Sequence, residues 1–297
     1  MEKSLVSTLT QTFPPLPLEE LLCEISTFQE KPFVEKQALI RRLVDAHPIL
    51  SLTWGPGHSY RRARRLHAGE SLPSEVDGVI WRKDIPAKAG RANAAGFPVL
   101  YLADNAETAF SEVGISDDQV VLAEFEIQPN KTVQIAPIGE MRQIQRTGRG
   151  ALSGGGSRAI SDLLNACGVE EARSLLIADA FLYDCLMNPD DDYSVSSLVA
   201  MNIFGKLPDV SVIAYPSRRQ TGALNFAVRV EGFWDRWGVS AVRCGRAVHL
   251  KYGYFRFHDV RHVVGITVSG SMRWDNNIVV PSLSNVLRPL WRPRVDA

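Results

Sequence analysis

A strand, turn and helix pattern in Gly90–Val113 constrains this chain more than any other feature. Val99–Leu102 is a short apolar run that a turn closes, which is typical of a buried strand. Asp104 or Asn105 can then accept hydrogen bonds from the first backbone N–H groups of a helix that begins at Ala106. The sequence therefore predicts a strand followed directly by a capped helix.

Two side chains of this unit are candidates for chemistry. Tyr101 lies on the predicted strand, and Glu112 shares one helix face with Ala109 and Val113 because three- and four-residue spacing brings side chains together. The alternative is that Tyr101 packs in a core and Glu112 is a solvated helix residue. On this fragment alone both interpretations stay open.

The composition excludes several classes of protein. In 297 residues, 33 basic side chains balance 33 acidic ones, so no global field favours nucleic acid or an anionic membrane. The four cysteines are widely spaced without a C-x-x-C pair, which argues against a disulfide framework or a structural zinc site and favours a reducing cytoplasm. No apolar run is long enough for a membrane span, and we expect no signal peptide.

Periodicity divides the chain. Leu18–Ala46 predicts two amphipathic helices with a break at Lys31-Pro32, and Glu170–Met187 and Ser194–Leu207 predict two more. The C-terminal third, from Phe233, is rich in β-branched and aromatic residues and predicts antiparallel strands. We expect three parts: an N-terminal helical extension over residues 1–57, a main domain over 58–280 with an insertion at about 139–165, and an irregular tail over 281–297.

The densest basic patch contains Arg61, Arg62, Arg64 and Arg65. Guanidinium groups bind phosphate oxygens through paired hydrogen bonds, so one interpretation is a phosphate site. The other is a solvated strand edge, on which alternation sends Arg62 and Arg64 to one face. Nucleic-acid binding is disfavoured because the run is short and no series of stacking aromatics accompanies it.

Other motifs carry little chemistry. Gly148–Gly156 lacks the Gly-Lys-Ser/Thr ending of a phosphate-binding loop, so we predict a flexible surface loop. The acidic turn Asn188–Asp192 lacks calcium-loop spacing, and His258 and His262 stand four apart in a stretch that looks extended. We therefore predict no metal site.

A second informative unit spans Val210–Val230. Val210–Ala214 predicts a strand that ends before Pro216, because proline cannot continue a central ladder. Ser217 follows the strand, where either a ligand contact or a turn cap is common, and Asn225 lies on the next predicted strand. No G-x-S-x-G elbow surrounds Ser217, so a hydrolase nucleophile is not supported.

Three of these blocks together resemble the RES domain, a bacterial family named for an arginine, a glutamate and a serine. Tyr60–Arg64 is similar to its opening arginine block, Gly90–Val113 to its central block, and Tyr215–Ala227 to its serine block. The resemblance covers residues from about 58 to 230. It implies an α+β fold with an ADP-ribosyltransferase-like mixed β-sheet core and flanking helices.

The family resemblance also implies an activity. Family members act as toxins of toxin–antitoxin pairs and cleave the bond between nicotinamide and ribose in NAD. Some do so by phosphorolysis or hydrolysis and deplete NAD; others transfer ADP-ribose to a protein. NAD would thus be the substrate, with inorganic phosphate as a candidate co-substrate, and no cofactor or metal is required.

Site residues follow from the resemblance in the same way. Arg62 would hold the pyrophosphate, with Arg61 and Arg64 as alternatives, and Tyr101 would pack on the nicotinamide or its ribose. Glu112 would act at the reacting ribose. A further pair is implied on the serine block: Ser217 would hydrogen-bond near the nicotinamide, and Asn225 would contact NAD.

Several expectations about partners accompany this assignment. A cognate antitoxin protein and a second copy of the chain in a homodimer are candidate partners, whereas membrane and nucleic acid are not. A non-catalytic module that binds a nucleotide or a partner stays open as an alternative to the enzyme.

Overall fold

The computed structural model describes residues 7–188, 192–278 and 286–293. Helices and strands are both well represented, and the α+β class implied by the resemblance is confirmed. The chain forms two compact units, each assembled from separate segments. The helical unit contains the described parts of Met1–Leu52, Lys88–Phe97 and Gln134–Ile213; the sheet unit contains those of Thr53–Ala87, Pro98–Val133 and Ala214–Ala297. The sequence division at residues 57 and 280 stays a prediction.

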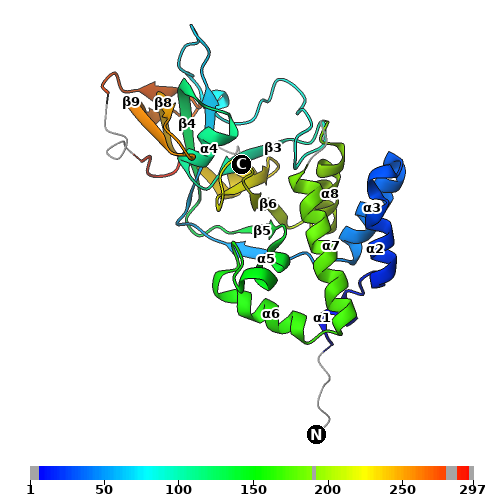
Figure 1. Ribbon diagram of the computed structural model, residues 1–297. Coiled ribbons are helices and arrows are strands. Elements are labelled where there is room, and N and C mark those ends of the chain that lie inside the picture. The colour runs from blue at the N-terminus through cyan, green and yellow to red at the C-terminus, as the bar shows by residue number, and fades with distance from the viewer. Residues whose placement is uncertain (1–6, 189–191, 279–285, 294–297) are drawn as a thin grey trace. The chain divides into compact units, whose positions relative to one another are not determined.

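In the helical unit, α7 (Val169–Met187) and α8 (Ser194–Lys206) pack against each other and against the helices near the N-terminus (Figure 1). α2 (Leu18–Ser26) and α3 (Phe33–Ala46) are separated at Lys31-Pro32, as predicted. α3 contributes a buried apolar stripe, and the Phe28 and Phe181 rings meet edge to face at 4.9 Å. Lys206 fixes the end of α3 by donating to the backbone oxygens of Val44, Asp45 and His47.

The remaining elements of this unit are shorter. They are α1 (Leu9–Thr12), η1 (Phe28–Glu30), α5 (Glu140–Thr147), η3 (Gly154–Gly156), α6 (Ser157–Asn165) and β5 (Val133–Pro137). The backbone passes between the units within β1 (Leu52–Trp54), after the first residue of β5, and within β6 (Val210–Pro216). The predicted end of β6 at Ala214 is wrong by two residues, because a proline in the last position of a strand leaves no internal ladder bond unmade.

The glycine-rich segment 148–156 is mostly exposed, as predicted for a surface loop, and it is also bound to a buried side chain. It wraps the buried carboxylate of Glu140, which accepts backbone N–H groups from Ala151, Leu152 and Ser153 at 3.0, 2.9 and 2.7 Å. Gly150 is required by this close approach, since a Cβ there would lie 2.1 Å from a Glu140 oxygen. The segment thus encloses an anion of its own chain.

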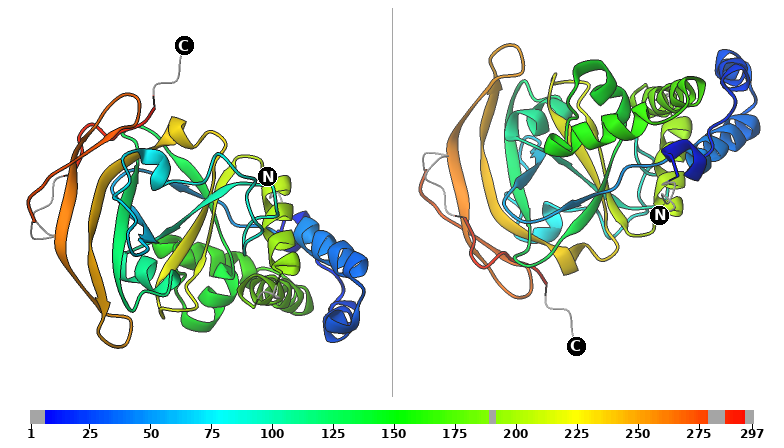
Figure 2. Two further views of the ribbon diagram at one scale, coloured as in Figure 1. Left: turned by 90° about the horizontal axis from the view of Figure 1, so that it is seen from above. Right: turned by 90° about the horizontal axis from the view of Figure 1, so that it is seen from below.

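The sheet unit is built on antiparallel strands in the order β7, β3, β2, β4, β8, β9, β10. Their bounds are β2 (Ser59–Arg65), β3 (Val99–Ala103), β4 (Asp117–Ile127), β7 (Leu224–Arg229), β8 (Trp237–His249), β9 (Phe255–Ile266) and β10 (Met272–Trp274). Figure 2 shows the long strands β4, β8 and β9 side by side and strongly curved. The antiparallel strands predicted for the C-terminal third are confirmed.

The two faces of this sheet differ. On one face, α4 (Ala106–Glu112) packs its Ala109 and Phe110 against Ala63 and Ala103. On the other, aromatic rings gather around Tyr60, which lies 4.9 and 5.1 Å from the rings of Phe226 and Trp237; η2 (Val76–Gly78) and α9 (Phe233–Arg236) complete the unit.

Among the described residues, no helix is long and apolar enough to cross a membrane. Two expectations from the sequence fall partly elsewhere: most of the acidic turn at 188–192 and most of the tail at 281–297 lie outside the described residues.

Candidate functional site

Two hydrogen bonds to Thr108 fix the first turn of helix α4. The Asn105 side chain accepts the backbone N–H of Thr108 at 2.7 Å, and the Thr108 hydroxyl lies 2.9 Å from an oxygen of Asp104. Of the two caps that the sequence allowed, Asn105 is the one observed. Because α4 is only two turns long, this cap determines where its last residue, Glu112, is held.

The Glu112 carboxylate is bound on one oxygen only. Its Oε1 accepts the Ser217 hydroxyl at 2.6 Å and the Asn225 amide at 2.7 Å. Its Oε2 has no hydrogen-bond partner among the described residues, and the side chain is partly exposed. The carboxylate is therefore oriented by two neutral donors and keeps one oxygen for a ligand.

Ser217 uses all of its hydrogen-bonding capacity. Its Oγ donates to Glu112 and accepts the backbone N–H groups of Arg219 and Gln220, each at 3.1 Å. Its own N–H donates to Ala223 O at 2.8 Å, which closes the loop. The Ser217 hydroxyl thus has its donor and two acceptor positions occupied, and it orients the Glu112 carboxylate.

Strand register decides which side chains share the face of Glu112. Arg61 pairs with Ala103, Ala103 with Asn225, and Tyr101 with Ala227. Directly paired residues project to the same side of a sheet. Since Asn225 contacts Glu112, the side chains of Arg61 and Tyr101 lie on the Glu112 face.

The neighbouring arginines lie on the other face. Arg62 and Arg64 alternate with Arg61, so both project away from α4. Within the described part of the chain, Arg62 makes one hydrogen bond, to the backbone oxygen of Tyr101 at 3.5 Å. Burial, followed by repulsion from Arg64, lowers the pKa of its guanidinium. Arg64 is paired with Glu70. The structure therefore does not bring Arg62 or Arg64 together with Glu112. Arg61, the remaining candidate from the sequence, lies on the Glu112 face, as does Arg65, which donates to Gly114 O.

Arg61 is held in one orientation. Its Nη1 donates to the backbone oxygens of Ser59 and Asp104, both at 2.8 Å, and its Nε lies 3.8 Å from Glu124. Glu124 is itself buried and paired with Arg243. Nη2 of Arg61 makes no hydrogen bond within the described part of the chain, so the guanidinium is positioned with one edge available to an anion.

Sequence reasoning missed Asp104 as more than a helix cap. Its side chain bonds the Leu224 N–H at 2.9 Å, and its backbone oxygen anchors Arg61. It thus joins the start of β7 to β3 and α4. A turn aspartate next to a predicted cap gives no sequence signal for this, because Leu224 is 120 residues away.

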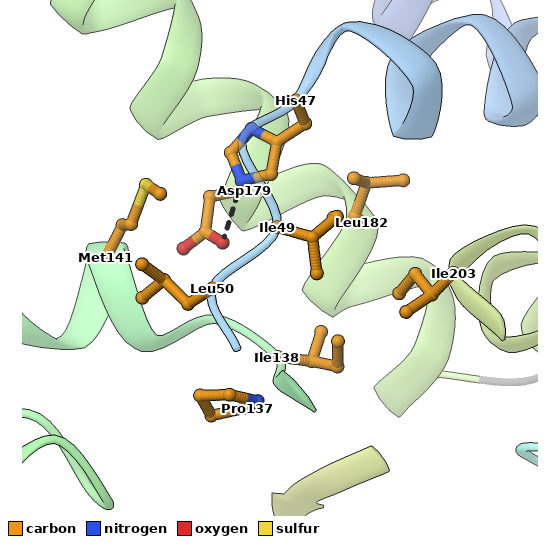
Figure 3. A pocket seen from close by; sticks show the side chains of 9 residues that line it. All are labelled: His47, Ile49, Leu50, Pro137, Ile138, Met141, Asp179, Leu182 and Ile203. Atoms are coloured by element: carbon orange, nitrogen blue, oxygen red, sulfur yellow. Dashed lines mark ion pairs between the residues drawn. The ribbon is translucent and has the colours of Figure 1, made fainter. Parts of the chain in front are cut away.

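In the helical unit, a histidine and an aspartate, His47 and Asp179, lie beside a small cavity (Figure 3). His47 Nε2 and Asp179 Oδ1 are 3.4 Å apart, and Asp179 Oδ2 accepts the Arg142 N–H at 2.9 Å. The adjoining cavity measures about 10 Å³ and is lined mainly by aliphatic side chains such as Ile49 and Leu182. It has room for about one water molecule, so this pair is structural.

The described residues contain no cluster of three or more His, Cys, Asp or Glu side chains that could hold a metal ion. His258 lies on β9 beside Asp259, with Nδ1 and Oδ2 at 2.8 Å, and His262 is buried in the same strand.

Comparison with known families identifies the region around Glu112. A family model of the RES domain matches residues 60–235, which includes Arg61, Tyr101, Glu112, Ser217 and Asn225. The chain belongs to the RES domain family. RES domains are associated with toxin-like enzymes that act on NAD. No curated protein matches the chain. The matched RES segment ends before β8, so the hairpin of β8 and β9 lies outside it.

Proposed function

We propose that the chain cleaves the nicotinamide–ribose bond of NAD and passes the ADP-ribosyl group to phosphate or water. The observation that carries this proposal is the half-bound carboxylate: Ser217 and Asn225 hold Glu112 Oε1, and Oε2 faces no protein donor among the described residues. A carboxylate fixed in this manner suits a reaction in which positive charge develops on a sugar.

The reaction itself explains why a carboxylate is needed. As the C1′–N bond breaks, its electron pair moves to the nicotinamide nitrogen, which leaves neutral, and the ribose gains oxocarbenium character. A preorganised carboxylate stabilises that charge more in the transition state than in the ground state. A phosphate or water oxygen then bonds to C1′, and water gives up a proton to Glu112 or to solvent.

Binding is assigned to the same face. Arg61 takes the pyrophosphate role in place of Arg62, because its guanidinium lies on the Glu112 face with Nη2 unused. Tyr101, partly exposed on β3, would pack against the nicotinamide or its ribose. Asn225 and Ser217 act through Glu112 as positioning residues.

The test is NAD consumption by the purified full chain, with and without inorganic phosphate, and with products separated by chromatography. Loss of NAD that is absent in Glu112→Gln would support the proposal, and ADP-ribose 1-phosphate or ADP-ribose would identify the acceptor. Label from NAD that stays on a polypeptide would instead indicate protein ADP-ribosylation. Bound but unchanged NAD would indicate a non-catalytic module.

Toxicity, an antitoxin partner and a homodimer belong to the same proposal. Expression of the chain alone should arrest growth and lower cellular NAD, and expression of Glu112→Gln should do neither. Unchanged growth and NAD with the unsubstituted chain would contradict the toxin assignment.

A further inference from the structure

The turn between β8 and β9 places a tyrosine where the backbone disfavours one. The Tyr254 N–H donates to Lys251 O at 3.0 Å, and Tyr252 and Gly253 have φ values of 54° and 81°. Positive φ at both central positions is the signature of a type I′ turn, which prefers Asn, Asp or Gly at the first of them. A bulky side chain in this conformation is an outlier that local folding preference does not explain.

Burial does not explain it either. The Tyr252 side chain is 92% exposed and that of Tyr254 is 65% exposed. Neither ring appears in a ring contact among the described residues, although Phe255 next to them lies 5.4 Å from the Phe110 ring. Two exposed aromatic rings at this turn are therefore available for contact with a ligand.

The turn lies beside the loop that orients Glu112. A Cβ built on Gly253 would be 3.5 Å from the Gln220 side chain. Gln220 donates its backbone N–H to Ser217 Oγ, which in turn donates to Glu112. At the base of the hairpin, Phe255 and Phe257 pack on Phe110 of α4, two residues from Glu112, so the hairpin is fixed to the helix that carries the carboxylate.

Charge near the turn suits an anionic nucleotide. Arg218, Arg219 and Lys251 are exposed, and none has an ion-pair partner within the described part of the chain. Elsewhere on β8, Arg246 is paired with Asp117. Unpaired cations next to exposed aromatic rings match a ligand that has both phosphates and flat bases.

We propose that Tyr252 stacks on the outward-facing base of NAD bound at the Glu112 site, so that the Lys251–Tyr254 turn forms the outer wall of the site. This inference rests on the proposed function. It adds a specificity-determining element that lies beyond the matched RES segment at residues 60–235.

The test separates stacking from folding. Tyr252→Asn places a residue that the turn prefers, so its unfolding temperature should equal or exceed that of the parent chain. In a Glu112→Gln background, which slows turnover enough to measure binding, calorimetry should show NAD binding weakened about 5- to 150-fold by Tyr252→Asn, the range of a lost base–aromatic stack. Tyr252→Phe should bind as the parent does. In the catalytically intact chain, Tyr252→Asn should raise KM and leave kcat unchanged.

Tyr193 in the helical unit also has a positive φ, of 61°, so Tyr193→Asn relieves similar strain and should leave NAD binding unchanged. Equal NAD affinity with and without Tyr252 would overturn the stacking proposal while NAD turnover kept the proposed function intact. If the parent chain neither bound nor cleaved NAD, both the stacking proposal and the proposed function would be contradicted. If Tyr252→Asn lost binding of single-stranded RNA but kept its affinity for NAD, the stacking proposal would be overturned in favour of a nucleic-acid contact at Tyr252.

Discussion

Two glutamates, one in each compact unit, show how the same side chain can be structural or functional. Glu140 is buried and accepts three backbone N–H groups, using both carboxylate oxygens. Glu112 is partly exposed and accepts two side-chain donors on one oxygen. The Glu140 carboxylate stabilises a loop, whereas the Glu112 carboxylate has one oxygen available to a ligand.

The difference lies in the origin of the donors. Backbone N–H groups from one continuous segment, residues 151–153, surround Glu140 and leave no approach for a ligand. Ser217 and Asn225 come from segments more than 100 residues away from Glu112 and approach it from one side. Hydrogen bonds of similar length therefore have different consequences, and the following variants test that distinction.

Replacement of either glutamate by glutamine should separate the two roles most strongly. Glu112→Gln should lower NAD turnover by about 10²- to 10⁴-fold with little change in stability, because it removes charge at the reacting centre. Glu140→Gln should lower the free energy of unfolding by about 2 kcal/mol, because an amide nitrogen cannot accept the enclosed N–H groups. Kinetics and urea unfolding on both variants measure this. If Glu112→Gln and Glu140→Gln, both folded, lowered NAD turnover equally, the distinction between a functional and a structural glutamate would be wrong.

The two adjacent arginines provide the next largest contrast. Arg61→Ala should weaken NAD binding by about 2 kcal/mol, or roughly 30-fold, because it removes a charged donor from the Glu112 face. Arg62→Ala, on the opposite face, should leave the Kd for NAD within about twofold. Calorimetric titration of folded protein measures both. A larger loss for Arg62→Ala would return the pyrophosphate role to Arg62 and contradict the register argument.

Gly150→Ala tests the enclosed carboxylate through its neighbour. The added Cβ would lie 2.1 Å from a Glu140 oxygen and 2.2 Å from the Ser153 hydroxyl, so we expect a loss of about 1–3 kcal/mol in unfolding free energy. Gly155→Ala is the matched control, because a Cβ there meets no atom within 4 Å. Thermal unfolding distinguishes them. If the two variants were equally stable, the hydrogen bonds of residues 151–153 to Glu140 would not contribute to the stability of the loop.

Ser217→Ala should give the smallest effect. Glu112 keeps its Asn225 donor, so we expect kcat to fall about tenfold, and the uncapped loop should cost about 1 kcal/mol of stability. Ser240→Ala is a control in the same unit, since the Ser240 hydroxyl is buried without a partner among the described residues. A loss of more than about 1,000-fold for Ser217→Ala, with normal folding, would indicate direct participation of Ser217 in the chemistry.

Local features of the fold were readable from the sequence. The capped helix after Val99–Ala103, the break between α2 and α3, and the long helix α7 all follow from spacing, caps and proline positions. That the glycine-rich segment is not a phosphate-binding loop stays a prediction. Its prediction as a surface loop is confirmed, because residues 148–156 are mostly exposed and contain no helix longer than the single turn η3. The sequence did not show that three N–H groups of this loop bind Glu140. Composition indicates that the backbone of a segment can bend easily, but it does not indicate which side chain that backbone will bind.

For the site, the sequence by itself determined the residue types and the strand alternation. It placed Glu112 near the end of a short capped helix, and it separated Arg61 and Arg65 from Arg62 and Arg64. It did not determine which of these sets faces Glu112, because alternation fixes relative faces only. Tertiary structure decided that: pairing of β2 with β3 and packing of α4 on Ala63 and Ala103 put Arg61 on the Glu112 face, and contacts across more than 100 residues brought Ser217 and Asn225 to its carboxylate.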